Sequence, residues 1–382
     1  MSADAEFRAA VLAAHGARGA EVGELLAYSE NAFVPAEGDT EWPLADEPFV
    51  AAWDGYAARA AGEGAAAVLG EVLPQLRFPI QDGMAAEDGY RAATLRGLPE
   101  SHPGGGVRFV DEAGIRLFVH PTAAGRIPVI VARARQDFVA LLRALTRKNQ
   151  PDAIPDSMGA CIVGGYNNWD RVARLRAEWE AHNAPAGWAA HFRDAVVPRR
   201  ELYQDRFILL SSGPYSAVDA ASLGLDADEW RERSVALRLD HECAHYFTRR
   251  VWGSMRNSLH DELIADYQGI RAVEGRYRAD WFLRFMGVES EDGYREGGRL
   301  QNYRGTPPLS DGAFTVLGRL VRSAAAGLEA MDALRPRGAV RPARETARVL
   351  SVLTAASLEE LASAESAQGV RTALATPEAA LA

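Results

Sequence analysis

Two histidines in the segment LDHECAHYF (239–247) are the residues in this chain whose types and spacing are best suited to chemistry. His241 and His245 are one helical turn apart, and Glu242 directly follows the first of them. On a helix, such histidines point the same way with their side chains about 6 Å apart, so the two imidazoles can share one cation. In this HExxH pattern the histidines ligate zinc and the glutamate takes a proton from the metal-bound water.

A third metal ligand must come from another segment, because a catalytic zinc site normally has three protein ligands. Metzincin enzymes continue the pattern as HExxHxxGxxH, but Thr248 stands at the glycine position and Val251 at the third histidine position, so that family is excluded. Cys243 lies about 200° around the helix from each histidine and therefore faces away from them.

The segment NSLHDELIADYQG (257–269) predicts a second helix that supplies the third ligand. Asn257 or Ser258 can cap its start, and a short connection makes it an antiparallel neighbour of the histidine helix. Glu262 then lies about one turn inside the second helix, facing the histidines. Asp266, four residues later on the same face, is placed to hold a ligating histidine by its second nitrogen.

Two neighbouring residues, His260 and Asp261, compete with Glu262 as the third ligand. They point about 100° to 200° elsewhere on the helix, and the spacing pairs Asp266 with Glu262, so Glu262 is preferred and His260 is the next choice. A further protein ligand from a distant segment would close the site and make it structural; the candidates are His120, His182 and His191.

These residues resemble the gluzincin metallopeptidases, the thermolysin-like and aminopeptidase-like zinc enzymes in which HExxH is followed by a helix that carries ExxxD. The resemblance is confined to about residues 226–275. It implies that Zn²⁺ is bound by His241, His245 and Glu262, that Glu242 is the general base, and that Asp266 holds a ligating histidine by its second nitrogen. It also implies a metallopeptidase that cleaves an amide bond. No GAMEN-type segment that reads a free amino terminus is present, so endo- and exopeptidase remain open.

A hydrolase of this kind also needs a hydrogen-bond donor for the oxyanion that develops during the reaction. Tyr303, in the segment GGRLQNYRG, is the predicted catalytic donor. Other candidates are Arg299, Tyr215, Tyr246 and Tyr294.

Two other functions use the same residues. Two histidines and one carboxylate also form the iron site of non-haem Fe(II) oxygenases. Alternatively, a metal ion staples two helices in a non-catalytic protein. Glu242 favours hydrolysis over oxygenation, because an oxygenase has no general need for a base beside its ligands.

Composition limits the partners of the chain. A net charge of -10 repels phosphate backbones, so nucleic acid is not expected as a partner. No apolar run approaches the roughly 20 residues that cross a bilayer, and the first fifty residues lack a secretory signal pattern. Two cysteines do not make a disulfide framework. We therefore expect a cytoplasmic protein with a peptide or small amide substrate and no membrane partner; its oligomeric state is not predicted.

The remaining pattern predicts a mainly helical α+β fold. Alternating or apolar runs predict a hairpin over 107–120 and strands over 126–134 and 205–218. A helix follows near 169, where Asn167 or Asn168 can cap it.

We expect three regions along the chain. Residues 1–105 form a helical amino-terminal region, and residues 106–255 form a zincin-like lobe with a small sheet and the HExxH helix. This lobe packs against a helical lobe, 256–382, that carries the third metal ligand.

Overall fold

The computed structural model describes residues 3–31, 33, 40–254, 259–290, 293–338, 342–364, 370 and 372. This described part contains fourteen α-helices and a four-stranded mixed sheet, which confirms the mainly helical α+β class. The chain forms two compact units, the helical unit (1–44 and 214–382) and the sheet unit (45–213). The three regions expected from the sequence, with boundaries near 105 and 255, stay a prediction. No helix among the described residues is long and apolar enough to cross a bilayer.

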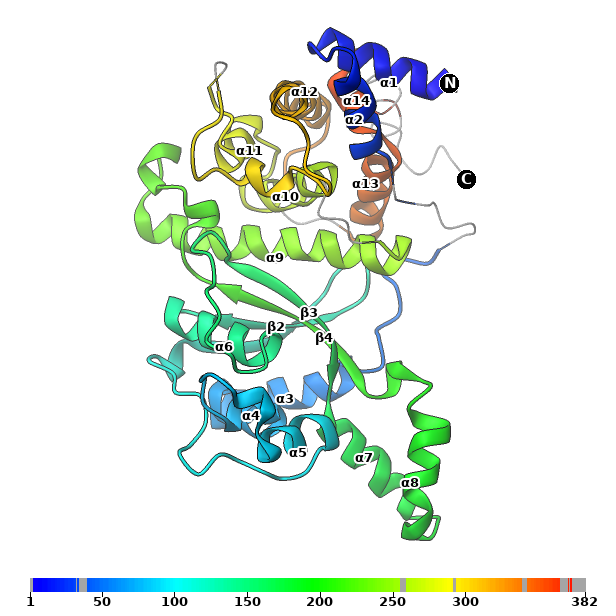
Figure 1. Cartoon of the computed structure of the whole chain (residues 1–382), viewed down its shortest axis with the longest axis vertical. Helices are drawn as coiled ribbons and strands as arrows, with labels where there is room; N and C mark the ends of the chain where they lie inside the picture. Colours follow the sequence, from blue (N-terminus) through cyan, green and yellow to red (C-terminus); the bar gives the residue numbers. More distant parts are fainter. Residues whose placement is uncertain are drawn as a thin grey trace. The chain divides into compact units, whose positions relative to one another are not determined.

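Each unit has its own set of elements (Figure 1). The helical unit contains α1 (Ala3–Ala14), α2 (Ala20–Tyr28), α9 (Ala227–Trp252), α10 (Leu259–Glu274), α11 (Ala279–Met286), α12 (Asp311–Asp332), α13 (Ala343–Ala355) and α14 (Leu358–Ala362). The sheet unit contains α3 (Val50–Glu63), α4 (Ala65–Val72), α5 (Asp88–Arg96), β1 (Ile115–His120), β2 (Ile127–Ala132), α6 (Arg135–Thr146), β3 (Ala160–Asn167), α7 (Trp169–Glu180), α8 (Trp188–His191) and β4 (Gln204–Ser211). Helix α9 thus belongs to the same unit as α10, whereas all four strands belong to the other.

The sheet has the strand order β1-β2-β4-β3, with β2 and β4 parallel and both outer pairs antiparallel. Strand β2 is buried along its whole length, as its continuous apolar run suggests. Side chains on one face of the sheet, including Ile130 and Leu209, join Trp53, Val68 and Leu141 from α3, α4 and α6 in one core. This core gives the sheet unit its stability through buried apolar area.

The hairpin predicted over 107–120 is wrong, because only its second half is a strand. The backbone amides of Val110 and Asp111 donate to the carboxylate of Asp137 instead of to a neighbouring strand. Strand β1 pairs with β2, which was predicted as a strand. Strand β3 was not predicted, since its glycines suggested a turn. The predicted helix after it is confirmed as α7, with Asn168 as its cap.

Helices α9 and α10 form the framework of the histidine segment. Asp226 caps α9, as expected, by accepting from the amides of Asp228 and Glu229 at 2.8 and 3.4 Å. Gly253, in the left-handed conformation, ends α9. A Cβ added to Gly269 of α10 would lie 2.6 Å from the carbonyl oxygen of Leu237, so glycine permits the close packing of the two helices.

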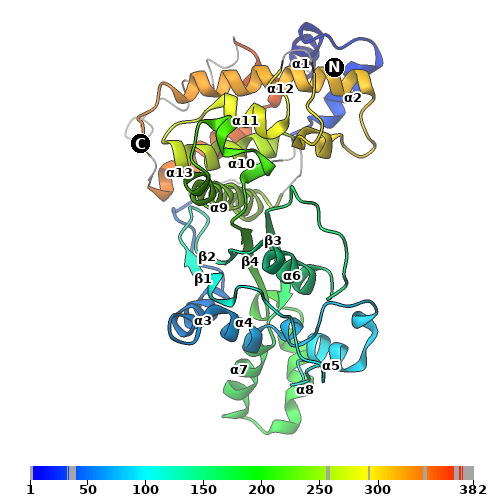
Figure 2. The same cartoon turned by 90° about the vertical axis from the view of Figure 1, so that its left-hand side faces the viewer.

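Helix α10 packs on α9 and also contacts α11 and α13 (Figure 1 and Figure 2). Four charged side chains of α10 are consequently buried: Asp261, Glu262, Asp266 and Arg271 are at most 5% exposed. Buried charges of this kind must be paired or must bind an ion. The predicted caps of α10, Asn257 and Ser258, lie outside the described residues.

The far end of α10 is held by a buried ion pair between Arg271 and Asp332 of α12. Asp332 also accepts from the hydroxyl of Tyr267 and from the amide of Tyr277, each at 2.7 Å. These contacts fix α10 along its length and so help to position the acids nearer its start.

Replacing Asp332 with asparagine is expected to lower the free energy of unfolding by about 3–5 kcal/mol, because Arg271 is left as an uncompensated buried charge. Chemical denaturation measures this loss. Asp311→Asn, on the same helix, is the control: its side chain is 94% exposed, so a change of at most about 1 kcal/mol is expected. Equal stability of the two variants would contradict the role given to Asp332.

Candidate metal centre

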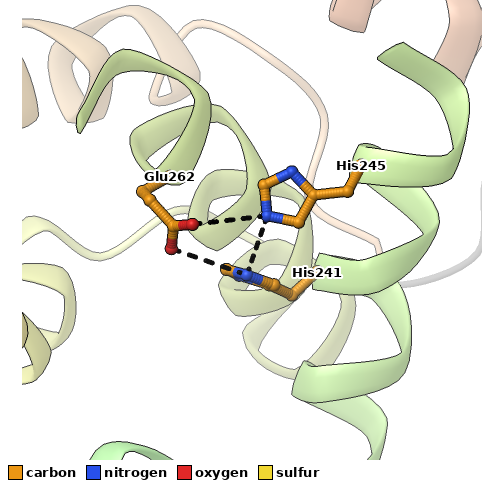
Figure 3. A group of neighbouring side chains, drawn as sticks. All are labelled: His241, His245 and Glu262. Carbon is orange, nitrogen blue, oxygen red and sulfur yellow. Dashed lines mark hydrogen bonds and ion pairs between the residues drawn. The ribbon is translucent and has the colours of Figure 1, made fainter. Parts of the chain in front are cut away.

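Three buried side chains from two neighbouring helices form the candidate metal centre (Figure 3). His241 and His245 come from α9 and Glu262 from α10. The two Nε2 atoms lie 3.2 Å apart, and they lie 3.6 and 3.5 Å from the Oε2 and Oε1 atoms of Glu262, respectively. Zinc bonds of about 2.0–2.2 Å at tetrahedral angles separate neighbouring ligand atoms by about 3.3 Å. The two Nε2 atoms have this separation, and each histidine lies near one oxygen of Glu262, so the three side chains can hold a single ion between them.

Each histidine has a carboxylate behind it. Nδ1 of His241 lies 2.8 Å from Oδ1 of Asp266, and Nδ1 of His245 lies 3.1 Å from Oδ2 of Asp261. A carboxylate at Nδ1 favours a proton on that nitrogen and leaves the Nε2 lone pair free for a cation. The hydrogen bond with Asp266 thus holds the ring of His241 in the tautomer and orientation that a metal ligand needs, whereas Asp261 lies close to Nδ1 of His245 without hydrogen-bond geometry.

Tyr215 lies on the rear side of His241. Its hydroxyl donates to Oδ1 of Asp266 at 2.5 Å and lies 3.0 Å from Nδ1 of the histidine. Because the hydroxyl proton goes to Asp266, this tyrosine does not suit the role of oxyanion donor that its sequence position left open. It supports the carboxylate that orients His241.

The charged groups around the site have a negative net charge that a divalent cation would balance. Asp261, Glu262 and Asp266 contribute three carboxylates, and Arg299 contributes one guanidinium, 2.6 Å from Glu262 and 3.2 Å from Asp266. When both imidazoles are neutral, as metal ligands must be, these four groups carry a net charge of -2; without a metal, the raised pKa of His245 keeps a proton on that ring. Buried charge of this size is costly unless it is compensated, so the donor set fits a divalent metal ion.

The same charges shift the pKa values of the site. Burial raises the pKa of Glu262, but a hydrogen bond with His245 and the charge of Arg299 outweigh it, so this pKa lies well below its usual range. Burial likewise raises the pKa of Asp266, but the charge of Arg299 and the contact with His241 outweigh it, so this pKa is also lowered. Burial lowers the pKa of His245, but Asp261 and Glu262 outweigh it and raise this pKa well above 6.5. The ligand carboxylate is therefore kept in its ionised form.

Glu242 is partly exposed and directly follows a candidate ligand in α9. Burial of most of the side chain raises the pKa of its carboxyl group, while the charges of His241 and His245 lower this pKa to a smaller extent. A raised pKa improves a carboxylate as a proton acceptor near neutral pH. The Glu242 carboxyl therefore interacts electrostatically with both candidate ligands, and its role as the general base stays a prediction.

Tyr303, the predicted oxyanion donor, lies at the end of the short 3₁₀ turn Arg299–Tyr303 and is partly exposed. Burial raises the pKa of its hydroxyl, the charge of Arg299 lowers it, and the charge of Glu262 raises it again, so that the net shift is upward. The hydroxyl therefore keeps its proton and interacts electrostatically with Glu262.

The other candidates from the sequence face elsewhere. His260 is buried with Nε2 3.1 Å from the carbonyl oxygen of Leu353, and its ring packs against Phe33. Tyr294 donates to the carbonyl of Gly298, and Tyr246 is a fully buried core residue. The group of described residues that can hold a metal contains three side chains; His120, His182 and His191 belong to the sheet unit.

Three residues at or near the site have contacts that the sequence did not predict. Asp261 was considered only as a competing ligand, yet it stands behind His245. Arg299 was considered as an oxyanion donor, yet it binds Glu262. Tyr28 of α2 accepts from the amide of Leu259 at 3.3 Å, and the charge of Glu262 contributes to its raised pKa. Of these three residues, only Asp261 is a sequence neighbour of Glu262, so only its place near the site could have been inferred from a local pattern.

Replacing Asp266 or Asp261 with asparagine is expected to weaken Zn²⁺ binding by about 10–100-fold, because each carboxylate orients one histidine. Competition with a chromophoric chelator measures the affinity. Asp228→Asn is the control, since this acid of α9 has an 85% exposed side chain and pairs with Arg231. If both buried variants bind zinc as tightly as the control, the carboxylates do not orient the ligands.

Comparison with known proteins places the chain in a family without assigning an activity. A search of the curated proteins and a search of the solved structures each gave no match. One family model, described as a family of unknown function (DUF7005), matches residues 10–365, which include the whole metal group. Because the match extends over nearly the full length, the chain belongs to the DUF7005 family.

Proposed function

We propose that this chain is a zinc-dependent hydrolase that cleaves an amide bond, with a peptide as the substrate class. The observation that carries the proposal is the convergence of two Nε2 atoms and one carboxylate at the separations of a tetrahedral zinc site. Three protein ligands leave one coordination position open, whereas structural zinc is normally closed by four. The resemblance of HExxH and ExxxD to the gluzincin metallopeptidases supports the peptide substrate.

In this proposal the chain's own residues carry the proton transfers. A bound divalent ion would supply Lewis acidity that lowers the pKa of a water molecule, so that the water could lose a proton near neutral pH and attack a carbonyl carbon. Glu242 accepts the proton of the attacking water and later delivers it to the nitrogen of the leaving amine. Its raised pKa suits both steps, since the group must gain and lose a proton near the working pH.

Tyr303 is proposed as the donor to the developing oxyanion. Its hydroxyl keeps its proton, lies near Glu262 and belongs to a partly exposed side chain that a substrate can reach. Tyr215 is buried and donates to Asp266, and Tyr294 donates to the carbonyl oxygen of Gly298, so the partly exposed Tyr303 near Glu262 fits this role best.

The ligand set by itself also suits Fe(II), so the metal needs a direct test. Protein purified without oxygen is expected to carry about one zinc ion per chain in elemental analysis. Stoichiometric iron together with oxygen uptake would reverse the assignment in favour of an oxygenase.

Glu242→Gln is expected to keep its zinc but to lose about 10²–10⁴-fold in turnover, because the amide cannot accept the proton of water. Hydrolysis of a fluorogenic peptide library and zinc content are measured on the same preparation. Glu232→Gln, at an exposed position on the same helix, should behave like the wild type. A Glu242→Gln variant that hydrolyses peptides at the wild-type rate would rule out the mechanism.

Tyr303→Phe is expected to lower kcat by about 10²–10³-fold with little change in KM or zinc content, because the lost hydrogen bond forms in the transition state. Steady-state kinetics on the best peptide from the library measures both constants. Tyr203→Phe in the sheet unit removes a hydroxyl elsewhere and serves as the control. Unchanged kcat in the Tyr303 variant would remove this tyrosine from the mechanism.

A further inference from the structure

Arg299 binds the candidate third ligand directly. Its Nη2 atom donates to Oε2 of Glu262 at 2.6 Å and lies 3.2 Å from Oδ2 of Asp266. Its Nη1 atom donates to the hydroxyl of Tyr215 at 2.8 Å and to Oγ of Ser216 at 3.0 Å. One guanidinium therefore joins the ligand from α10, the carboxylate behind His241 and the tyrosine that supports that carboxylate.

These contacts leave the guanidinium little capacity to bind a substrate. Arg299 is 9% exposed, its two terminal nitrogens are both engaged by protein acceptors, and its plane lies over the ring of Tyr215 at 5.3 Å. A substrate carboxylate would have to displace Glu262 or Tyr215 to reach it. The role of Arg299 must therefore act through the residues that it already holds.

A fixed positive charge beside a metal ligand has two effects on a cation. It repels the ion, and in the low-dielectric interior this repulsion is stronger than in water. It also forms a charge-assisted hydrogen bond with one oxygen of the ligand, Oε2, so the metal must share or forgo that oxygen. The other oxygen, Oε1, faces His245.

We propose that Arg299 is a positioning residue that makes Glu262 a ligand through one oxygen and lowers the affinity of the site for divalent cations. This inference rests on the proposed metal site. Holding Oε2 keeps the number of protein donor atoms at three and so preserves an open position for water. The lowered affinity makes metal uptake reversible, and the same guanidinium compensates Glu262 and Asp266 before the metal arrives.

Arg238 is a matched comparison for Arg299. It is also buried, and its guanidinium lies over the ring of Tyr215 at 5.5 Å, but its Nη2 atom donates to the carbonyl oxygen of Pro214. Removing either arginine disturbs a buried cation beside the same tyrosine, and it is Arg299 whose contact with a candidate metal ligand the structure describes.

The test compares Arg299→Gln, Arg299→Lys and Arg238→Gln in the full chain. Zn²⁺ affinity is measured by chelator competition, and the coordination number by the visible spectrum of the Co²⁺-loaded protein, since four-coordinate Co²⁺ absorbs much more strongly than five-coordinate Co²⁺. Arg299→Gln is expected to bind Zn²⁺ at least about tenfold more tightly and to lose Co²⁺ absorption as Glu262 binds through both oxygens. Arg299→Lys keeps the positive charge beside Glu262, and Arg238→Gln keeps the contact of Arg299 with Glu262, so both variants should bind zinc like the wild type.

Wild-type affinity or weaker binding in Arg299→Gln, with an unchanged Co²⁺ spectrum, would overturn the inference and leave Arg299 a packing residue. If that variant does not fold, the wild-type Co²⁺ spectrum decides: a four-coordinate spectrum supports the one-oxygen ligand, and a five-coordinate spectrum overturns it.

The failure of the proposed function gives a different result. If wild-type protein binds neither ion, or if His245→Ala binds both as tightly as the wild type, the metal site itself is wrong. If binding is lost in His245→Ala but is the same in all the arginine variants, only the role of Arg299 is wrong.

Discussion

The pairing of each imidazole with its own carboxylate is the interaction on which the rest of this structure depends. Asp266 faces Nδ1 of His241 and Asp261 faces Nδ1 of His245, so both Nε2 atoms are directed toward Glu262. All three acids come from the first two turns of α10. One helix therefore supplies a ligand and both orienting groups, and any shift of that helix would misplace the whole set.

This arrangement explains why α10 is so strongly fixed. A helix with several ionised acids among buried side chains loses hydration energy that must be recovered by pairing. Arg299 recovers part of it near Glu262 and Asp266, and Arg271 with Asp332 holds the other end. Close packing on α9, which Gly269 permits, completes the framework. The remaining negative charge at the centre is the part that a divalent cation would balance.

Local signals in the sequence were sufficient for part of this account. Three predictions depend on residues within a few turns of one another: the cap at Asp226, the helical spacing of His241 and His245, and the ExxxD spacing of Glu262 and Asp266. The structure brings the two histidines and the two acids of the last two patterns together. The mainly helical α+β class followed from the same periodic patterns. Strand β3 was missed because its glycines resemble a turn. The first half of the predicted hairpin bonds to Asp137, a partner that no local pattern names. The contact of Arg299 with Glu262 joins residues 37 positions apart and was likewise beyond periodicity.

The most direct test of the central claim is a crystal structure of the protein grown with zinc, with anomalous diffraction measured on both sides of the zinc absorption edge. The account predicts one strong anomalous peak about 2.0–2.2 Å from both Nε2 atoms and from an oxygen of Glu262. A peak elsewhere, or density that shows Glu262 bound only to Arg299 while the ion is held by other residues, would contradict it.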